Sequence, residues 1–217
     1  MLSKDSLPFR LYGVTDRSRL GGRPLAEALE VLGAQGLRGV QLREKDLDEG
    51  ALEALAAACR PVLDRWRVVW LVNGPAALAE RAGAPGVHVT ASGDVAAVRS
   101  LLGPNRLVGQ SAHGVEDVRA AARGGADFVV VGPVFATPSK AACGEPLGLE
   151  VLRAACAAAD PVPVFAIGGV TPERARACRS AGAAGVAAQG PLMQAAAAGA
   201  AAARDVLARY ADALGGL

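Results

Sequence analysis

The stretch VFAIGGVTPERARACRSAGAAGVAAQG, residues 164–190, contains two short apolar runs on either side of a helical segment. The first run, Val164–Ile167, ends in two glycines. Thr171-Pro172 then offers a helix N-cap followed by proline at the first helical position, a combination that favours a helix start. The second run, Gly185–Ala188, follows the helical segment. This order predicts one strand–helix–strand unit of a parallel sheet.

The same unit repeats along the chain on the N-terminal side of this stretch. Strands are predicted at Arg10–Val14, Gly39–Leu42, Val68–Val72, Gly86–Val89, Leu107–Gln110, Phe128–Val131, Val164–Ile167 and Gly185–Ala188. Helical periodicity separates them, and in the segment Asp48–Leu63 the apolar residues recur on one face. Those residues are Leu52, Leu55, Ala56, Cys59 and Leu63. A last, alanine-rich helix is predicted over Met193–Leu214.

Eight strands alternating with helices over 217 residues predict an α/β protein with a single (β/α)₈ TIM-barrel domain, residues 1–217. The competing fold is an open doubly wound sheet. That fold usually has fewer units and a G-x-G-x-x-G motif after its first strand, which this sequence lacks. Functional residues of a barrel stand where the strands end, so the polar residues at those positions are the candidates.

The overall composition argues against several classes of partner. The net charge is +2 and aromatic residues make up 4%, which disfavours a nucleic-acid surface. Residues 1–9 lack the apolar core of a signal peptide. The uncharged segment 180–203 is mostly alanine and glycine, too weakly apolar to drive membrane insertion. We therefore expect a soluble protein of the cytoplasm with no nucleic-acid or membrane partner, and a homo-oligomer remains open.

The four cysteines show neither a C-x-x-C pair nor a spacing that suits zinc. Cys59, Cys156 and Cys178 fall in predicted helices and are expected to be plain thiols in a reducing compartment. Cys143 falls in a long loop, where a reactive role stays open.

The second strand carries an unusual polar face. Gln41, Arg43 and Lys45 alternate along it, so their side chains project together, while Val40 and Leu42 face the helices. Two cations and an amide inside a barrel are costly unless an anion neutralises them. The pattern predicts a phosphate or diphosphate clamp. An internal ion pair with nearby acids is the alternative.

Polar residues also follow the third, fourth and fifth strands. Asn73 begins an Asn-Gly pair that serves equally as a turn. His88 lies within the fourth strand, where a core role competes with a catalytic one. Ser111 and His113 follow the fifth strand and are plausible ligand contacts.

The remaining candidates follow strands six to eight. Thr137, Ser139 and Lys140 occur in the 17-residue segment 132–148. A loop this long is usually functional, and these side chains suit anion binding. Glycines after strands seven and eight form the usual phosphate site of this fold, although they also suit tight turns. The residues there are Gly168, Gly169, Gln189 and Gly190. Two anion sites in one mouth predict a transferase that joins two small phosphorylated molecules.

Over nearly its whole length the sequence resembles thiamine phosphate synthase and the related thiazole tautomerase family. The resemblance rests on seven motifs in order. They are YGVTD at 12–16, VQLREK at 40–45, GVH at 86–88, SAH at 111–113, GPVF at 132–135, TPSK at 137–140 and IGG at 167–169.

The resemblance implies a reaction in which an aminopyrimidine methyl diphosphate loses pyrophosphate and the thiazole nitrogen of thiazole phosphate captures the resulting cation. It also implies a role for each matching residue. Gln41, Arg43, Lys45 and Lys140 would hold the diphosphate. Asn73 and Ser111 would contact the pyrimidine, and Thr137, Ser139, Gly169 and the Gly190 backbone would hold the thiazole phosphate.

The synthase pattern also includes two acids that hold Mg²⁺, one after strand three and one after strand four. Gly74 and Gly93 occupy those positions here, so Asp94, one residue later, is the candidate Mg²⁺ ligand. The Asn-Gly pair resembles tautomerase-like members instead. The histidine of the known tautomerase corresponds to Pro133, so His88 or His113 would carry the proton. A non-catalytic binder of thiazole phosphate or thiamine phosphate is the third possibility.

Overall fold

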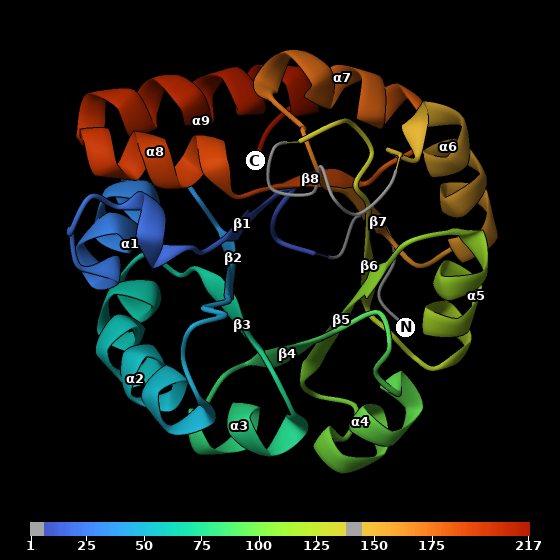
Figure 1. The fold of residues 1–217 in the computed structure, drawn as a ribbon, viewed down its shortest axis with the longest axis horizontal. Helices are drawn as coiled ribbons and strands as arrows, with labels where there is room; N and C mark the ends of the chain where they lie inside the picture. The colour runs from blue at the N-terminus through green and yellow to red at the C-terminus, as the bar shows by residue number, and fades with distance from the viewer. Residues whose placement is uncertain (1–6, 138–144) are drawn as a thin grey trace.

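The computed structural model describes residues 7–137 and 145–217. Eight parallel strands form a closed barrel in the order β1 to β8, and β8 pairs with β1 to complete it. Figure 1 shows the strands as an inner ring with the helices around it. The predicted (β/α)₈ TIM barrel is therefore confirmed for the described residues.

The elements have the following bounds. The strands are β1 (Leu11–Val14), β2 (Gly39–Leu42), β3 (Val69–Asn73), β4 (Gly86–Val89), β5 (Leu107–Ala112), β6 (Phe128–Val131), β7 (Val164–Ala166) and β8 (Gly185–Ala188). The helices are α1 (Leu25–Ala34), α2 (Glu49–Arg65), α3 (Ala76–Arg81), α4 (Val95–Leu102), α5 (Val115–Arg123), α6 (Gly148–Ala159), α7 (Pro172–Ser180), α8 (Gly190–Ala198) and α9 (Ala200–Leu214), with a 3₁₀ turn η1 (Arg17–Arg19) after β1.

The last helix differs from its prediction. The expected helix over Met193–Leu214 is wrong, because the chain forms α8 and α9 with a break at Gly199. Gly199 has φ +110°, a conformation that other residues rarely adopt and that ends the helical hydrogen bonding. The two helices then lie side by side in Figure 1.

Two apolar layers hold the barrel. Val40 and Leu42 point outward and pack with the helices, as predicted. Inside the barrel the aromatic rings gather: Phe9 stacks on Tyr12 with ring centroids 5.4 Å apart, and Phe128 meets Tyr12 edge-on at 5.2 Å. Phe165 joins this cluster, 5.6 Å from Phe128. These rings fill the part of the interior nearer the amino ends of the strands, which leaves the open space at the carboxyl ends.

The C-terminal residues are attached to Arg10, the residue that precedes β1. Arg10 donates hydrogen bonds from its guanidinium to the carbonyls of Leu214 and Gly215, at 3.1 and 3.2 Å. Tyr210 of α9 donates to the carbonyl of Val170 at 2.8 Å. The C-terminal helix is therefore attached to both the first strand and the β7–α7 junction.

Cys59, Cys156 and Cys178 are buried and form no disulfide, as predicted for plain thiols, and Cys143 lies outside the described residues. Within the described parts of the chain, every helix is too short or too polar to cross a membrane.

Candidate functional site

A cavity of about 430 Å³ opens among the segments that follow the carboxyl ends of the strands. It brings together most of the predicted site residues. Those that line it are Gln41, Arg43, Lys45, His88, Ser111, His113, Thr137, Gly168, Gly169, Gln189 and Gly190. Because they come from β2, β4, β5 and the loops after β6, β7 and β8, the barrel mouth forms one site from residues far apart in the sequence.

Two predicted residues that the structure describes, Asn73 and Asp94, are not among the cavity lining. Asn73 ends β3 and accepts a hydrogen bond through Oδ1 from Gln41 Nε2 at 2.9 Å. It therefore lies next to the cavity and orients a residue that lines it. Asp94 lies at the start of α4. Ser139 and Lys140 fall outside the described residues, so their roles stay predictions.

Arg43 is half-buried and lines the cavity. Burial lowers the pKa of its guanidinium, while the charges of Asp16 and Glu44 act in the opposite direction. Both acids are engaged by other partners: Asp16 pairs with Arg19 and Glu44 with Arg17. Among the described residues nothing forms a hydrogen bond or ion pair with the Arg43 guanidinium. These contacts favour an anion clamp over the internal ion pair.

Glu44 is a buried acid that the sequence analysis did not identify. Its side chain is 2% exposed, and Oε2 accepts a hydrogen bond from the backbone N–H of Arg17 at 2.9 Å. Strand alternation places it on the outer face with Val40 and Leu42, which is the available signal for its burial. Burial, with the nearby Glu44 charge, raises the pKa of the Cys59 thiol to about 12, so this thiol stays protonated.

His88 forms part of the cavity floor. Its side chain is buried, and Nε2 lies 3.0 Å from the Ser111 hydroxyl oxygen. Its ring stacks on Tyr12 with the centroids 5.9 Å apart. Burial, reinforced by the charge of Arg43, lowers the pKa of His88 to about 3. The imidazole is therefore neutral near pH 7 and orients the Ser111 hydroxyl.

His113 stands at the exposed rim of the cavity. Nδ1 lies 2.6 Å from the carbonyl oxygen of Gly132. A carbonyl oxygen only accepts hydrogen bonds, so Nδ1 carries a proton, and in the neutral ring the lone pair is on Nε2. The backbone N–H of His113 donates to Asp117 at 2.8 Å, which fixes the residue at the start of α5. This imidazole is suited to accept a proton from a bound molecule.

Gly168 and Gly169 line the cavity and also form a tight junction with the loop after β6. They have φ values of +91° and +62°. A Cβ on Gly168 would lie 2.5 Å from the Cα of Pro133, and one on Gly169 would lie 2.6 Å from the carbonyl oxygen of Ala136. The turn therefore requires glycine at both positions. Their predicted contact with phosphate stays a prediction.

The surroundings of Asp94, the predicted Mg²⁺ ligand, do not fit such a site. Asp94 is exposed and caps α4, where Oδ1 accepts a hydrogen bond from the Ala97 N–H at 3.0 Å. A Cβ on Gly93 would collide with the Val89 Cγ1, so an acid at this position would require the chain or Val89 to shift. The described cavity lining includes neither Asp nor Glu, and the described residues contain no group of three His, Cys, Asp or Glu that could hold a metal.

Arg19, in the η1 turn after β1, is a cavity-lining cation that the sequence analysis did not identify. Its Nη1 lies 3.9 Å from the position that a Cβ on Gly190 would occupy. Its place soon after a barrel strand was the available signal, since such positions face the mouth.

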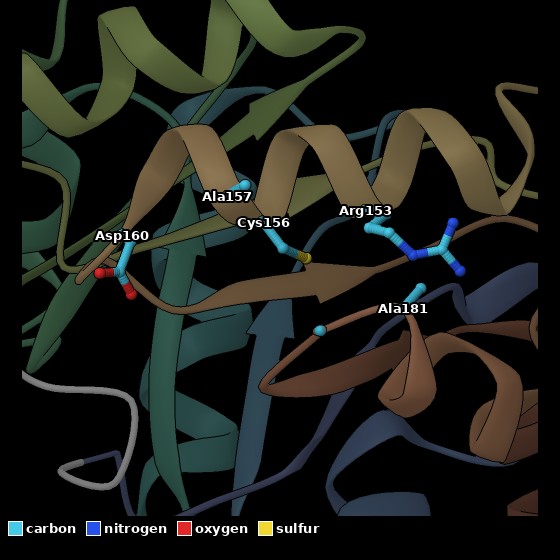
Figure 2. A pocket seen from close by; sticks show the side chains of 6 residues that line it. Arg153, Cys156, Ala157, Asp160 and Ala181 are labelled. Carbon is cyan, nitrogen blue, oxygen red and sulfur yellow. The ribbon is translucent and has the colours of Figure 1, made fainter.

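A second hollow, of about 420 Å³, lies on the outside of the barrel beside α6. Figure 2 shows Arg153, Cys156 and Asp160 along this helix, with Ala181 opposite. None of the predicted site residues lines it. The barrel mouth is therefore the candidate site.

Comparisons with known proteins point to one family. A family model described as thiamine monophosphate synthase matches residues 11–192. A Geobacter sulfurreducens protein, provisionally named thiamine-phosphate synthase, is 48% identical over 180 residues, which cover 82% of this chain and 84% of the relative. Thiamine-phosphate synthase of Roseiflexus castenholzii is 40% identical over 179 residues, covering 82% and 78%. The solved structure of thiamine phosphate pyrophosphorylase from Pyrococcus furiosus matches with a TM-score of 0.79 and 25% identity, covering 94% and 96% of the two chains.

Proposed function

Because this chain belongs to the thiamine monophosphate synthase family, we propose that it joins an aminopyrimidine methyl diphosphate to thiazole phosphate and releases pyrophosphate. The observation that carries the proposal is the Arg43 guanidinium, which lines the cavity without a hydrogen bond or ion pair to any described residue. A half-buried cation of this kind is stabilised by a bound anion. The diphosphate supplies that anion.

The reaction consists of one bond broken and one bond formed. The bond between the pyrimidine methylene carbon and the diphosphate oxygen breaks, and its electron pair leaves with pyrophosphate. The thiazole nitrogen then donates its lone pair to the methylene cation and forms the new C–N bond. Arg43 and Lys45 stabilise the charge that develops on the leaving pyrophosphate, with Lys140 as a third predicted contributor.

The other cavity residues hold the two organic groups. Ser111, oriented by neutral His88, hydrogen-bonds the pyrimidine, and Gln41 is kept in place by Asn73. Thr137, Ser139, Gly169 and the Gly190 backbone bind the thiazole phosphate. The usual magnesium site of the family lacks its acids here, so no step of this mechanism depends on a metal.

The activity is tested by supplying both substrates to the purified protein and measuring thiamine phosphate. Arg43→Gln should lower kcat/KM by about 100-fold to 1,000-fold, the usual cost of removing one stabilising donor. Arg119→Gln is the matched control, since it removes the same charge from an exposed residue of α5. Absence of product with the native protein, or equal activity of the two variants, would contradict the proposal.

A second candidate, thiazole phosphate tautomerase, is favoured by one observation. The Gly132 carbonyl fixes the proton of His113 on Nδ1, which leaves a lone pair on Nε2 that can accept a proton. NMR of the thiazole phosphate tautomers should then show faster aromatisation with the protein, and His113→Gln should abolish the effect. Binding of thiazole phosphate without turnover in either assay would instead identify a non-catalytic binder.

A further inference from the structure

Arg19 reaches the barrel mouth from the η1 turn, on the side of the cavity where β8 meets α8. It lines the cavity, and its Nη1 lies 3.9 Å from the position of a Cβ on Gly190. Gly190 is the residue whose backbone is proposed to meet the thiazole phosphate. A guanidinium is therefore placed next to that phosphate by a segment 171 residues earlier in the chain.

One acid pairs with this guanidinium, and a second acid anchors the turn that carries it. Asp16 Oδ2 accepts a hydrogen bond from Arg19 Nε at 2.8 Å, and Asp16 Oδ1 accepts one from the Ser18 hydroxyl. The buried carboxylate of Glu44 accepts from the Arg17 backbone N–H at 2.9 Å and thereby anchors the same turn. The Arg19 side chain is 35% exposed, so the pair with Asp16 remains partly in contact with water.

The contact with Asp16 uses only one edge of the guanidinium. Nε faces the carboxylate, and the terminal nitrogens make no hydrogen bond with any described residue. An arginine edge with free N–H groups matches the spacing of two phosphate oxygens. The described cavity lining contains no acid that could occupy this edge instead.

We propose that Arg19 is a substrate-binding residue that donates hydrogen bonds to the monophosphate of thiazole phosphate. The inference rests on the proposed function, because it takes thiazole phosphate as the molecule in the cavity. It assigns Arg19 to the monophosphate and Arg43 and Lys45 to the diphosphate. The two substrates are thus held by separate sets of cations.

The test compares binding of thiazole phosphate and of the dephosphorylated thiazole alcohol by calorimetry. Arg19→Gln should weaken binding of thiazole phosphate by about 10-fold to 100-fold, the range for losing hydrogen bonds to a charged group, and leave binding of the alcohol unchanged. Arg19→Lys keeps the charge and should give an intermediate loss. Arg119→Gln controls for net charge, and thermal melts verify that each variant is folded.

Steady-state kinetics separate Arg19 from the diphosphate clamp. Arg19→Gln should raise the KM for thiazole phosphate and leave the KM for the diphosphate substrate unchanged, whereas Arg43→Gln should raise the KM for the diphosphate substrate.

The calorimetric outcomes separate this inference from the proposed function. Equal binding of thiazole phosphate by the native protein and Arg19→Gln would overturn the role of Arg19 alone. No binding of thiazole phosphate by the native protein would overturn the proposed function together with this inference. If Arg19→Gln fails to fold, Arg19→Lys decides between these outcomes.

Discussion

His88 and His113 line the same cavity but differ in burial and in bonding. His88 is buried and bonded to Ser111, and burial and the charge of Arg43 lower its pKa, so it is neutral near pH 7 and orients the Ser111 hydroxyl. His113 is exposed at the rim, and its bond to the Gly132 carbonyl selects the tautomer with a free Nε2. At the scale of single residues, the surroundings of each imidazole decide which one can transfer a proton.

The lowered pKa of His88 makes stability depend on pH. His88 has a pKa of about 3 in the folded chain and its ordinary value near 6.5 in the unfolded chain. Between these values the unfolded chain binds a proton that the folded chain does not. The free energy of unfolding should therefore fall as the pH falls below 6.5, by at most about 1.4 kcal/mol per pH unit. Urea denaturation at several pH values measures this dependence of the free energy of unfolding on pH.

The variant that tests this dependence is His88→Gln. It removes the buried imidazole and should flatten the dependence of stability on pH between 5 and 7. An unchanged slope in His88→Gln would show that this residue is not buried in its neutral form.

Side chains that alternate along one strand could be predicted from the sequence. The period of two places Gln41, Arg43 and Lys45 on one face, and all three line the cavity. Arg19 and Glu44 were missed because their roles depend on contacts between segments. The η1 turn must first fold back onto β2 before the Glu44 carboxylate meets the Arg17 N–H. No local pattern encodes that approach.

Asp94, which the sequence analysis proposed as a Mg²⁺ ligand, is the N-cap of α4. It caps α4 in the same way that Asp48 caps α2, where Oδ1 accepts from the Ala51 N–H at 2.8 Å. A carboxylate at this position satisfies a free N–H of the first turn and interacts favourably with the helix dipole. Its geometry is explained by the helix alone.

Replacement of Asp94 tests this structural role. Asp94→Ala should lower the free energy of unfolding by about 1 kcal/mol, the usual cost of losing a cap. Asp94→Ser restores a capping oxygen without a charge and should recover most of that loss. Turnover measured with both substrates should be the same in Asp94→Ser as in the native protein. A large loss of magnesium-dependent turnover in Asp94→Ser would instead support the predicted metal role.

Element types and most strand positions were predictable, because apolar runs and helical periods alternate clearly. The break between α8 and α9 was not, since alanine continues on both sides of Gly199 and one glycine does not always end a helix. The close packing of Gly168 and Gly169 against the loop after β6 could not be predicted from the sequence pattern either. Close approach of two backbones is visible only in three dimensions.

Seen as a whole, the barrel has an apolar half and a polar half. Phe9, Tyr12, Phe128 and Phe165 fill the interior below the cavity. His88 lies at the boundary, 5.9 Å from Tyr12 and 6.0 Å from Phe128 between ring centroids. The aromatic cluster therefore supports the floor on which the substrates would rest, which couples core packing to binding.

Truncation of Phe128 tests that coupling. Phe128→Ala should lower the free energy of unfolding by about 3 to 5 kcal/mol, and Phe128→Leu should cost less because it leaves a smaller cavity. Both variants should also weaken binding of the aminopyrimidine methyl diphosphate, since His88 and Ser111 lose their support. Leu101→Ala, at a side chain 71% exposed, should change the stability by less than about 0.5 kcal/mol. If Phe128→Ala folds and binds the aminopyrimidine methyl diphosphate as tightly as the native protein, packing of the aromatic cluster does not influence binding in the cavity.

The pairing of β1 with β8 has a consequence for synthesis of the chain. Leu11 aligns with Val186, so the first strand leaves the ribosome long before its second neighbour exists. Until then one edge of β1 lacks its partner and Tyr12 lacks part of its surroundings. Closure of the cylinder must wait for the final quarter of the polypeptide, and a nascent chain that stalls earlier would display an unpaired edge open to aggregation.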